Sequence, residues 1–263
     1  MTCAITCESS SREPDAIRTL LYSDGDVVRC PTYKMAQMGE IKLVLFDVDG
    51  VLLDSLVPHL RICQDKSREY QLNLRIPNPS EFRTMVRAGV KISPMKFMFM
   101  AVGFPEALAQ KADDQYKRVF SRDYAPTLFP GTYETLRSLH HAGRQLGIVT
   151  ANVKANVTEA LGLSYKFFRS DCVYTKSDME DLSKTEAITA AMARTGVSAA
   201  HTVYIGDQPA DLESAKAAGV DFVGVTYGWG FTSEDTGIPL LQSVREIAPY
   251  VLGFTASAPG AAL

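Results

Sequence analysis

The amino-acid sequence predicts an α/β protein in which a parallel sheet carries helices on both faces. Three observations lead to this fold class. Short apolar runs of strand length alternate with segments of helical periodicity. Glycines follow the helical segments, as expected where a helix ends. Polar side chains come directly after the strands. The predicted strands are 42–46, 145–149, 172–174, 202–205 and 221–226, and the helix-ending glycines are Gly143, Gly162, Gly196 and Gly219. Beyond Pro239 the sequence predicts one amphipathic helix.

The first predicted strand, 42–46, ends on two carboxylates. Asp47 and Asp49 follow the apolar run, and Gly50 then allows the chain to turn. Because alternate residues of an extended chain point to the same side, the two carboxylates leave one face and repel each other. A buried strand end is a costly place for them unless they share a cation or a proton. This pair is therefore a candidate catalytic site.

The next strand, 145–149, ends on Thr150, Ala151 and Asn152. A hydroxyl group followed by exposed backbone N–H groups at a strand-to-helix junction can bind a phosphate group. Further along the chain, Lys184 opens a predicted helix, where the helix dipole disfavours a positive charge. That position predicts an anion close to Lys184.

The strand at 202–205 is followed by Gly206, Asp207 and, one helical turn later, Asp211. In a parallel sheet the carboxyl ends of the strands converge on one crevice, where ligands bind. We therefore expect Asp207 and Asp211 to lie near Asp47 and Asp49. Carboxylate oxygens in such a group are the ligands that Mg²⁺ prefers.

Residues 56–126 form a predicted helical insert, punctuated by Pro77, Pro79, Pro94 and Pro105. One predicted helix carries Leu56, Leu60, Cys63 and Ser67, and another carries Ala107, Ala112, Tyr116 and Phe120. Arg87 and Lys91 flank a possible hinge at Gly89. These two basic residues are candidates for contacting a substrate.

The segment DVDGVLLDS at 47–55 resembles the first motif, DxDGxLxDS, of the haloacid dehalogenase-like hydrolase superfamily. Thr150 to Asn152 resembles the second motif, Lys184 the third and GDQPAD at 206–211 the fourth, GDxxxD. In the third motif Thr185 stands where proline usually follows the lysine, so Lys176 is an alternative for that lysine. The position of the insert is similar to the α-helical cap of phosphoglycolate phosphatase and β-phosphoglucomutase enzymes.

The resemblance implies a Rossmann-like core with an inserted α-helical cap. Residues 1–40 would be an N-terminal extension, 41–55 and 127–254 the core, 56–126 the cap and 255–263 a loose tail. Within the extension, Asp24 and Gly25 suggest a hairpin turn. We leave open whether the extension is ordered.

The resemblance also implies a role for each motif residue. Asp47 would be the nucleophile and Asp49 the general acid and base. Mg²⁺ would be bound by Asp47, Asp207 and the backbone carbonyl of Asp49, with Asp211 holding a water or orienting the other ligands. The phosphoryl group would be bound by Thr150, Ala151, Asn152 and Lys184.

The implied function is that of a Mg²⁺-dependent phosphatase that hydrolyses a small phosphorylated metabolite through an aspartyl-phosphate intermediate. A phosphomutase of the β-phosphoglucomutase type shares all four motifs and remains an alternative. Metal-free dehalogenation is disfavoured, because those enzymes lack the second aspartate of the first motif. A catalytically idle phosphate-binding or interaction module is the alternative of another class.

Composition and charge indicate which partners and which cellular location to expect. The formal net charge is −3, which disfavours a nucleic-acid partner. No apolar run reaches the length of a membrane span, and the first residues do not resemble a secretory leader. The five cysteines contain no CxxC pair and are expected to be reduced. We therefore expect a cytoplasmic protein, monomeric or homodimeric, that binds no membrane.

Overall fold

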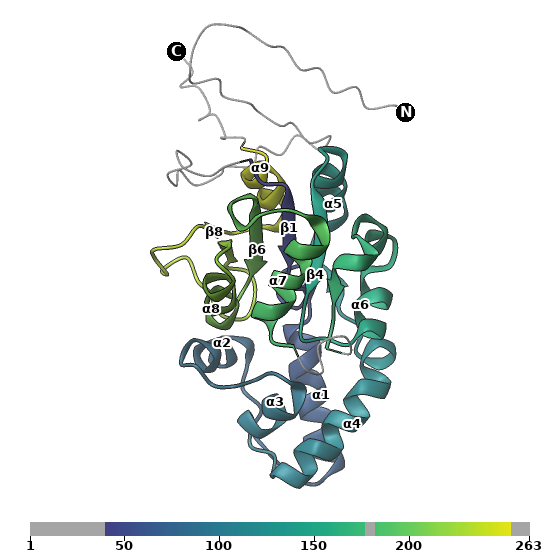
Figure 1. The fold of residues 1–263 in the computed structure, drawn as a ribbon. Coiled ribbons are helices and arrows are strands. Elements are labelled where there is room, and N and C mark those ends of the chain that lie inside the picture. Colours follow the sequence, from purple (N-terminus) through teal and green to yellow (C-terminus); the bar gives the residue numbers. More distant parts are fainter. Residues whose placement is uncertain (1–39, 177–181, 254–263) are drawn as a thin grey trace, which may run out of the picture.

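A six-stranded parallel sheet forms the centre of the protein. The computed structural model describes residues 40–176 and 182–253. The strand order is β5-β4-β1-β6-β7-β8, and every pairing is parallel. Figure 1 labels β1, β4, β6 and β8 of this sheet. This confirms the predicted fold class. The strands are β1 (Leu43–Phe46), β4 (Gln145–Val149), β5 (Val173–Tyr174), β6 (Thr202–Gly206), β7 (Asp221–Val225) and β8 (Leu240–Leu241).

Helices cover both faces of this sheet because the central strands are apolar on both sides. In β1, Val44 and Phe46 belong to one apolar cluster, whereas Leu43 and Leu45 belong to another. The first cluster includes side chains of α5 (Thr132–His141), α6 (Lys154–Leu161) and α9 (Ile247–Val251). The second includes side chains of α7 (Lys184–Thr195) and α8 (Pro209–Ala218).

Four helices form an insert between the short strands β2 (Leu53–Asp54) and β3 (Thr127–Leu128), which pair antiparallel. We call this segment the helical insert; its helices lie together at the lower end of Figure 1. They share an apolar cluster separate from the two clusters of the sheet. The helices are α1 (Leu56–Glu69), α2 (Pro79–Arg87), α3 (Met95–Ala101) and α4 (Glu106–Asp123).

The structure differs from the sequence-based expectation in two places. Beyond Pro239 we expected one amphipathic helix, but the chain forms β8, a 3-10 turn at Val244–Glu246 and the short α9. The apolar side of α4 includes Ala109 rather than Ala107, which is exposed. Short 3-10 segments also occur at Gly162–Phe167, Ser170–Cys172 and Ala199–His201.

Some expectations concern parts of the chain that the structure does not describe. The hairpin at Asp24 and Gly25, residues 1–39 of the N-terminal extension and the loose tail at 255–263 lie outside the described residues. Within residues 40–176 and 182–253, no helix has both the length and the apolar character needed to cross a bilayer.

Candidate active site

The candidate site lies at the carboxyl ends of three adjacent strands in the middle of the sheet. Asp47 follows β1, Thr150 follows β4, and Asp207 follows β6. β1 pairs with both of the other two strands, so the chain segments that leave them emerge side by side. The structure thus brings together residues that lie up to 160 positions apart in the sequence. All three side chains are buried.

Lys184 bridges two carboxylates at the centre of the site. Its Nζ lies 2.8 Å from Oδ2 of Asp47 and 2.7 Å from Oδ1 of Asp211. Burial lowers the pKa of Lys184, but Asp211 and Asp47 outweigh this effect and raise it well above its ordinary value. Lys184 is therefore positively charged at neutral pH. The other carboxylate oxygen of Asp47 accepts a hydrogen bond from the backbone N–H of Val48, at 2.8 Å.

A capping box places Lys184 at the first position of α7. The Ser183 side chain accepts a hydrogen bond from the backbone N–H of Glu186, and the Glu186 carboxylate accepts one from the Ser183 backbone N–H. This motif fixes the start of the helix without the proline that usually follows the lysine. Lys176, the alternative for this position, lines the same cavity, but no ion pair with Asp47 or Asp211 is found for it among the described residues.

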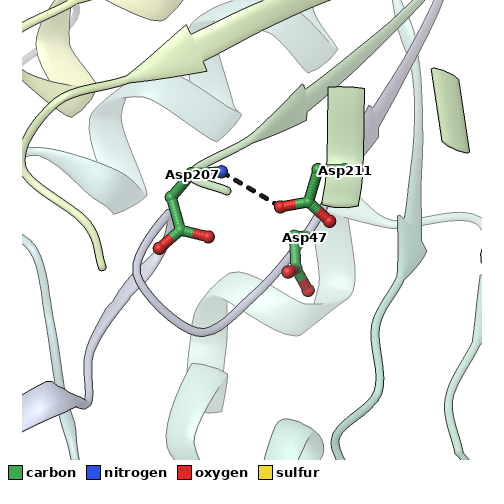
Figure 2. A group of neighbouring side chains, drawn as sticks. All are labelled: Asp47, Asp207 and Asp211. Carbon is green, nitrogen blue, oxygen red and sulfur yellow. Dashed lines mark hydrogen bonds between the residues drawn. The ribbon is translucent and has the colours of Figure 1, made fainter. Parts of the chain in front are cut away.

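Asp47, Asp207 and Asp211 form a buried carboxylate cluster (Figure 2). Their candidate ligand oxygens lie within 4.8 Å of one another. Burial, followed by the negative charges of Asp211 and Asp47, raises the pKa of Asp207 well above its ordinary value. Oδ1 of Asp207 is buried and has no hydrogen-bond partner among the described residues. Buried acceptors without a donor and an excess of negative charge fit the oxygen-ligand chemistry of a hard cation such as Mg²⁺.

Backbone groups fix the orientation of two members of this cluster. The Trp229 backbone N–H donates to Oδ2 of Asp207, at 2.6 Å. Oδ2 of Asp211 accepts from the backbone N–H groups of Asp207 and Gln208, each at 3.2 Å; Figure 2 draws the first of these bonds. With Lys184 on its other oxygen, Asp211 is well placed to orient the site rather than to bind a metal directly.

Asp49 lies next to the polar residues that follow β4. Its Oδ2 accepts a hydrogen bond from Nδ2 of Asn152, at 2.8 Å, while its Oδ1 is buried without a partner among the described residues. The Thr150 side chain lies nearby and accepts from the Asn152 backbone N–H, at 3.3 Å. The side-chain amide of Asn152 thus donates to Asp49. The Thr150 hydroxyl hydrogen and the Ala151 backbone N–H remain as candidates for binding a phosphoryl group.

These residues open on a cavity of about 330 Å³ between the sheet and the helical insert. This volume is at the small end of the range for ligand pockets, and it suits a small metabolite. The sheet and the helices and loops next to it contribute Asp47, Asp49, Thr150, Ala151, Asn152, Lys176, Lys184 and Asp211 to the lining. The insert contributes His59, Ile92, Ser93, Met95, Met98, Asp113, Tyr116 and Lys117.

Sequence reasoning missed His59, Tyr116 and Trp229. His59 is buried; one ring nitrogen lies 2.6 Å from the Ser55 carbonyl oxygen and the other 3.1 Å from the Tyr116 hydroxyl. Burial lowers the pKa of His59, although Asp49 opposes this change. The ring of Trp229 packs edge-on against His59, with centroids 4.9 Å apart. The spacing of His59 on the apolar side of α1 was a usable signal, but an isolated histidine does not indicate its partners.

The two basic residues proposed as substrate contacts lie elsewhere. Arg87 forms an ion pair with Asp235, at 2.7 Å, and donates to Thr232. The ammonium group of Lys91 lies 3.8 Å from the centre of the Phe97 ring. Neither residue lines the cavity. Arg87 instead joins α2 to the loop that follows β7.

The sequence profile of the haloacid dehalogenase-like hydrolases matches residues 44–225, which is more than half of the chain. The chain belongs to this family. The match extends from the strand that carries Asp47 to the end of β7, so it includes the carboxylate cluster and Lys184, whereas Trp229 lies beyond it.

Curated relatives and solved structures agree with this assignment. A phosphoglycolate phosphatase of Pseudomonas syringae pv. tomato is 28% identical over 230 residues, covering 82% of this chain and 81% of the relative. One from Vibrio vulnificus is 29% identical over 201 residues, covering 72% and 86%. A predicted phosphatase from Clostridium acetobutylicum has a TM-score of 0.67 at 24% identity, covering 82% of this chain and all of the other. CbbY from Rhodobacter sphaeroides in complex with phosphate has a TM-score of 0.60 at 20% identity, covering 81% and 99%. Together these matches identify a phosphatase of the family.

Gly50 provides a direct test of the carboxylate cluster. Its φ of +80° favours glycine, and an added Cβ would lie 2.8 Å from Cγ of Asp207 and would overlap its carboxylate. We expect Gly50→Ala to weaken Mg²⁺ activation about 10- to 100-fold, because the alanine displaces a carboxylate of the candidate metal site. A Mg²⁺ titration of phosphate release measures this change.

Gly143→Ala is the matched control. Gly143 has a similar φ of +77°, but an added Cβ meets no atom within 4 Å. It therefore reproduces the backbone strain, about 1 kcal/mol, without the collision. Equal Mg²⁺ titrations for the two variants would contradict the proposed position of the metal.

Proposed function

We propose that this enzyme is a Mg²⁺-dependent phosphatase that acts on a small phosphorylated metabolite through an aspartyl-phosphate. The observation that carries the proposal is the position of Lys184 between Asp47 and Asp211, together with an Asp207 oxygen that has no hydrogen-bond partner among the described residues. A nucleophilic carboxylate, a fixed cation and a candidate metal site meet there at one end of a small cavity.

Asp47 attacks phosphorus with a carboxylate oxygen, and the bond from phosphorus to the leaving alkoxide breaks. Asp49 enters this step protonated and gives its proton to the departing oxygen, so the alcohol leaves neutral. A water molecule then attacks the aspartyl-phosphate while Asp49 takes up one of its protons. The bond between phosphorus and Asp47 breaks, and both carboxylates return to their starting states.

The remaining residues compensate negative charge. Lys184 is oriented toward the attacking carboxylate, and the Thr150 hydroxyl with the Ala151 N–H can donate to the phosphoryl oxygens. Asp47, Asp207 and the Asp49 carbonyl would hold Mg²⁺, which would further neutralise the charge on those oxygens. Asn152 holds Asp49 in place for proton transfer, at 2.8 Å.

The helical insert acts as a cap in this proposal. It supplies one side of the cavity, so its closed position excludes bulk water from the reacting groups. Because the curated relatives are phosphoglycolate phosphatases, 2-phosphoglycolate is the first substrate to test. We place the enzyme in the cytoplasm, in keeping with the buried free thiols of Cys63 and Cys172.

The test is phosphate release from a panel of small phosphate esters, measured with Mg²⁺ and after removal of divalent cations with EDTA. We expect release from one or a few compounds, a loss of at least about 100-fold in EDTA and recovery when Mg²⁺ is added in excess. Full activity in EDTA would contradict the metal dependence. Isomerisation of a sugar phosphate without phosphate release would instead indicate the mutase.

A further inference from the structure

The cavity holds a second group of charged side chains that the proposed mechanism does not use. Asp113 and Lys117 lie on α4 of the helical insert, and Lys176 follows β5 of the sheet. All three line the cavity. Together they carry two positive charges and one negative charge, so this part of the cavity favours a ligand group with negative charge.

Asp113 fixes the position of Lys117. Its Oδ2 lies 2.7 Å from the Lys117 Nζ, one helical turn along α4, and the Asp113 side chain is only 6% exposed. Asp114 also lies 3.5 Å from this ammonium group, but it is half exposed and does not line the cavity. Solvent therefore screens Asp114, while the Asp113–Lys117 pair forms a fixed part of the cavity wall.

Lys176 approaches this pair from the sheet side. Burial lowers the pKa of Lys176, Asp113 opposes that effect, and the positive charge of Lys117 adds to it. The two lysines therefore act on each other electrostatically although they belong to different layers of the protein. An anion bound near both lysines would reduce their mutual repulsion and would offset the cost of partly burying the charge of Lys176.

Tyr116 lines the same cavity as this group and the reacting carboxylates. Burial, followed by the negative charges of Asp49 and Asp113, raises the pKa of Tyr116 well above its ordinary value, so Tyr116 lies within the influence of both ends. Its hydroxyl is 3.1 Å from the His59 ring. Tyr116 therefore lies in a part of the cavity that is electrostatically close both to Asp49 and to the Asp113–Lys117 pair.

We propose that Lys117 and Lys176 bind an anionic group on the leaving-group side of the substrate, namely a carboxylate or a second phosphate. This inference rests on the proposed function, because it assigns the leaving group to the side of Asp49. The substrate class is then a phosphate ester of a short hydroxy acid or a small bisphosphate. The reaction releases an anionic alcohol rather than a neutral one.

Three two-carbon esters test the proposal because they differ only at the far end. They are 2-phosphoglycolate, with a carboxylate; ethylene glycol bisphosphate, with a second phosphate; and 2-hydroxyethyl phosphate, with a neutral hydroxyl. We expect kcat/KM to favour one or both anionic esters, and Lys117→Met and Lys176→Met each to reduce that preference at least about tenfold. The anionic ester that the unchanged enzyme prefers identifies the group. Lys216→Met, an exposed lysine that does not line the cavity, is the matched control and leaves the preference unchanged.

Binding provides a second measurement that needs no turnover. In an Asp47→Asn background, calorimetry with the same esters should show a weaker affinity for the anionic ones when either lysine is replaced, and an unchanged affinity for 2-hydroxyethyl phosphate. Equal preferences in the unchanged protein and both lysine variants would overturn the inference. Failure of the proposed phosphatase function would give a different result, because no ester, including p-nitrophenyl phosphate, would then release phosphate. The calorimetry would still test whether the two lysines bind the anionic group.

Discussion

Asp47→Asn is expected to abolish phosphate release, by at least about 10³-fold, while the protein stays folded. The amide keeps the shape of the side chain but cannot attack phosphorus as a carboxylate does. The substitution also removes one of three crowded negative charges, whose repulsion raises the pKa of Asp207. We therefore expect the unfolding midpoint without Mg²⁺ to stay the same or to rise. Phosphate release and thermal unfolding on one preparation measure both effects.

Asp54→Asn is the control for this experiment. Asp54 lies in the same segment of the chain but is exposed, and it should leave both activity and stability unchanged. Turnover by Asp47→Asn close to that of the unchanged enzyme would refute covalent catalysis by Asp47. Loss of activity together with a large fall in the unfolding midpoint would show instead that Asp47 is mainly structural.

Lys184→Met is expected to reduce both activity and stability. Among the described residues, Lys184 forms ion pairs with two members of the carboxylate cluster, Asp47 and Asp211. Its side chain is 20% exposed. Its removal leaves Asp47 and Asp211 as buried charges without their partner, which costs about 3–5 kcal/mol of unfolding free energy. Turnover should fall about 10²- to 10³-fold, because charge on the phosphoryl oxygens is no longer compensated.

Mg²⁺ separates the two contributions of Lys184. A divalent cation neutralises the same carboxylates, so Mg²⁺ should stabilise Lys184→Met against denaturant more than it stabilises the unchanged protein. Turnover should not recover, since the ammonium group itself is missing. Lys216→Met serves again as the control. A variant that kept its stability without Mg²⁺ would contradict the electrostatic description of the site.

The core half of the site was predictable because its residues follow strands. Asp47 and Asp207 each end an apolar run, and parallel strands must deliver such positions to one edge of the sheet. Lys184 was predictable from its unfavourable position at the start of a helix. In each case the local sequence identifies the residue, and the parallel topology of the sheet explains why these residues lie close together.

The insert half of the site was not predictable in the same way. Periodicity indicates which side of α4 is apolar, but not how α4 faces the sheet, so it gave no reason to prefer Lys117 over Arg87. Arg87 looked suitable because a glycine follows it closely, yet its partner is Asp235, 148 residues away. Trp229 contributes a backbone N–H to Asp207, and sequence pattern contains no information about such a bond.

Trp229 also connects the candidate metal site to the helical insert, so we expect the two to depend on each other thermodynamically. Its backbone holds Asp207, while its ring belongs to the apolar cluster of the insert and packs against His59 and Phe82. Coupling between two such sites is reciprocal. If a cation bound at Asp207 stabilises the packing of Trp229 in the insert, then a well-packed insert increases the affinity for that cation by the same free energy. Substitutions in the apolar interior of the insert should therefore alter the Mg²⁺ concentration at which the proposed activity is half-maximal.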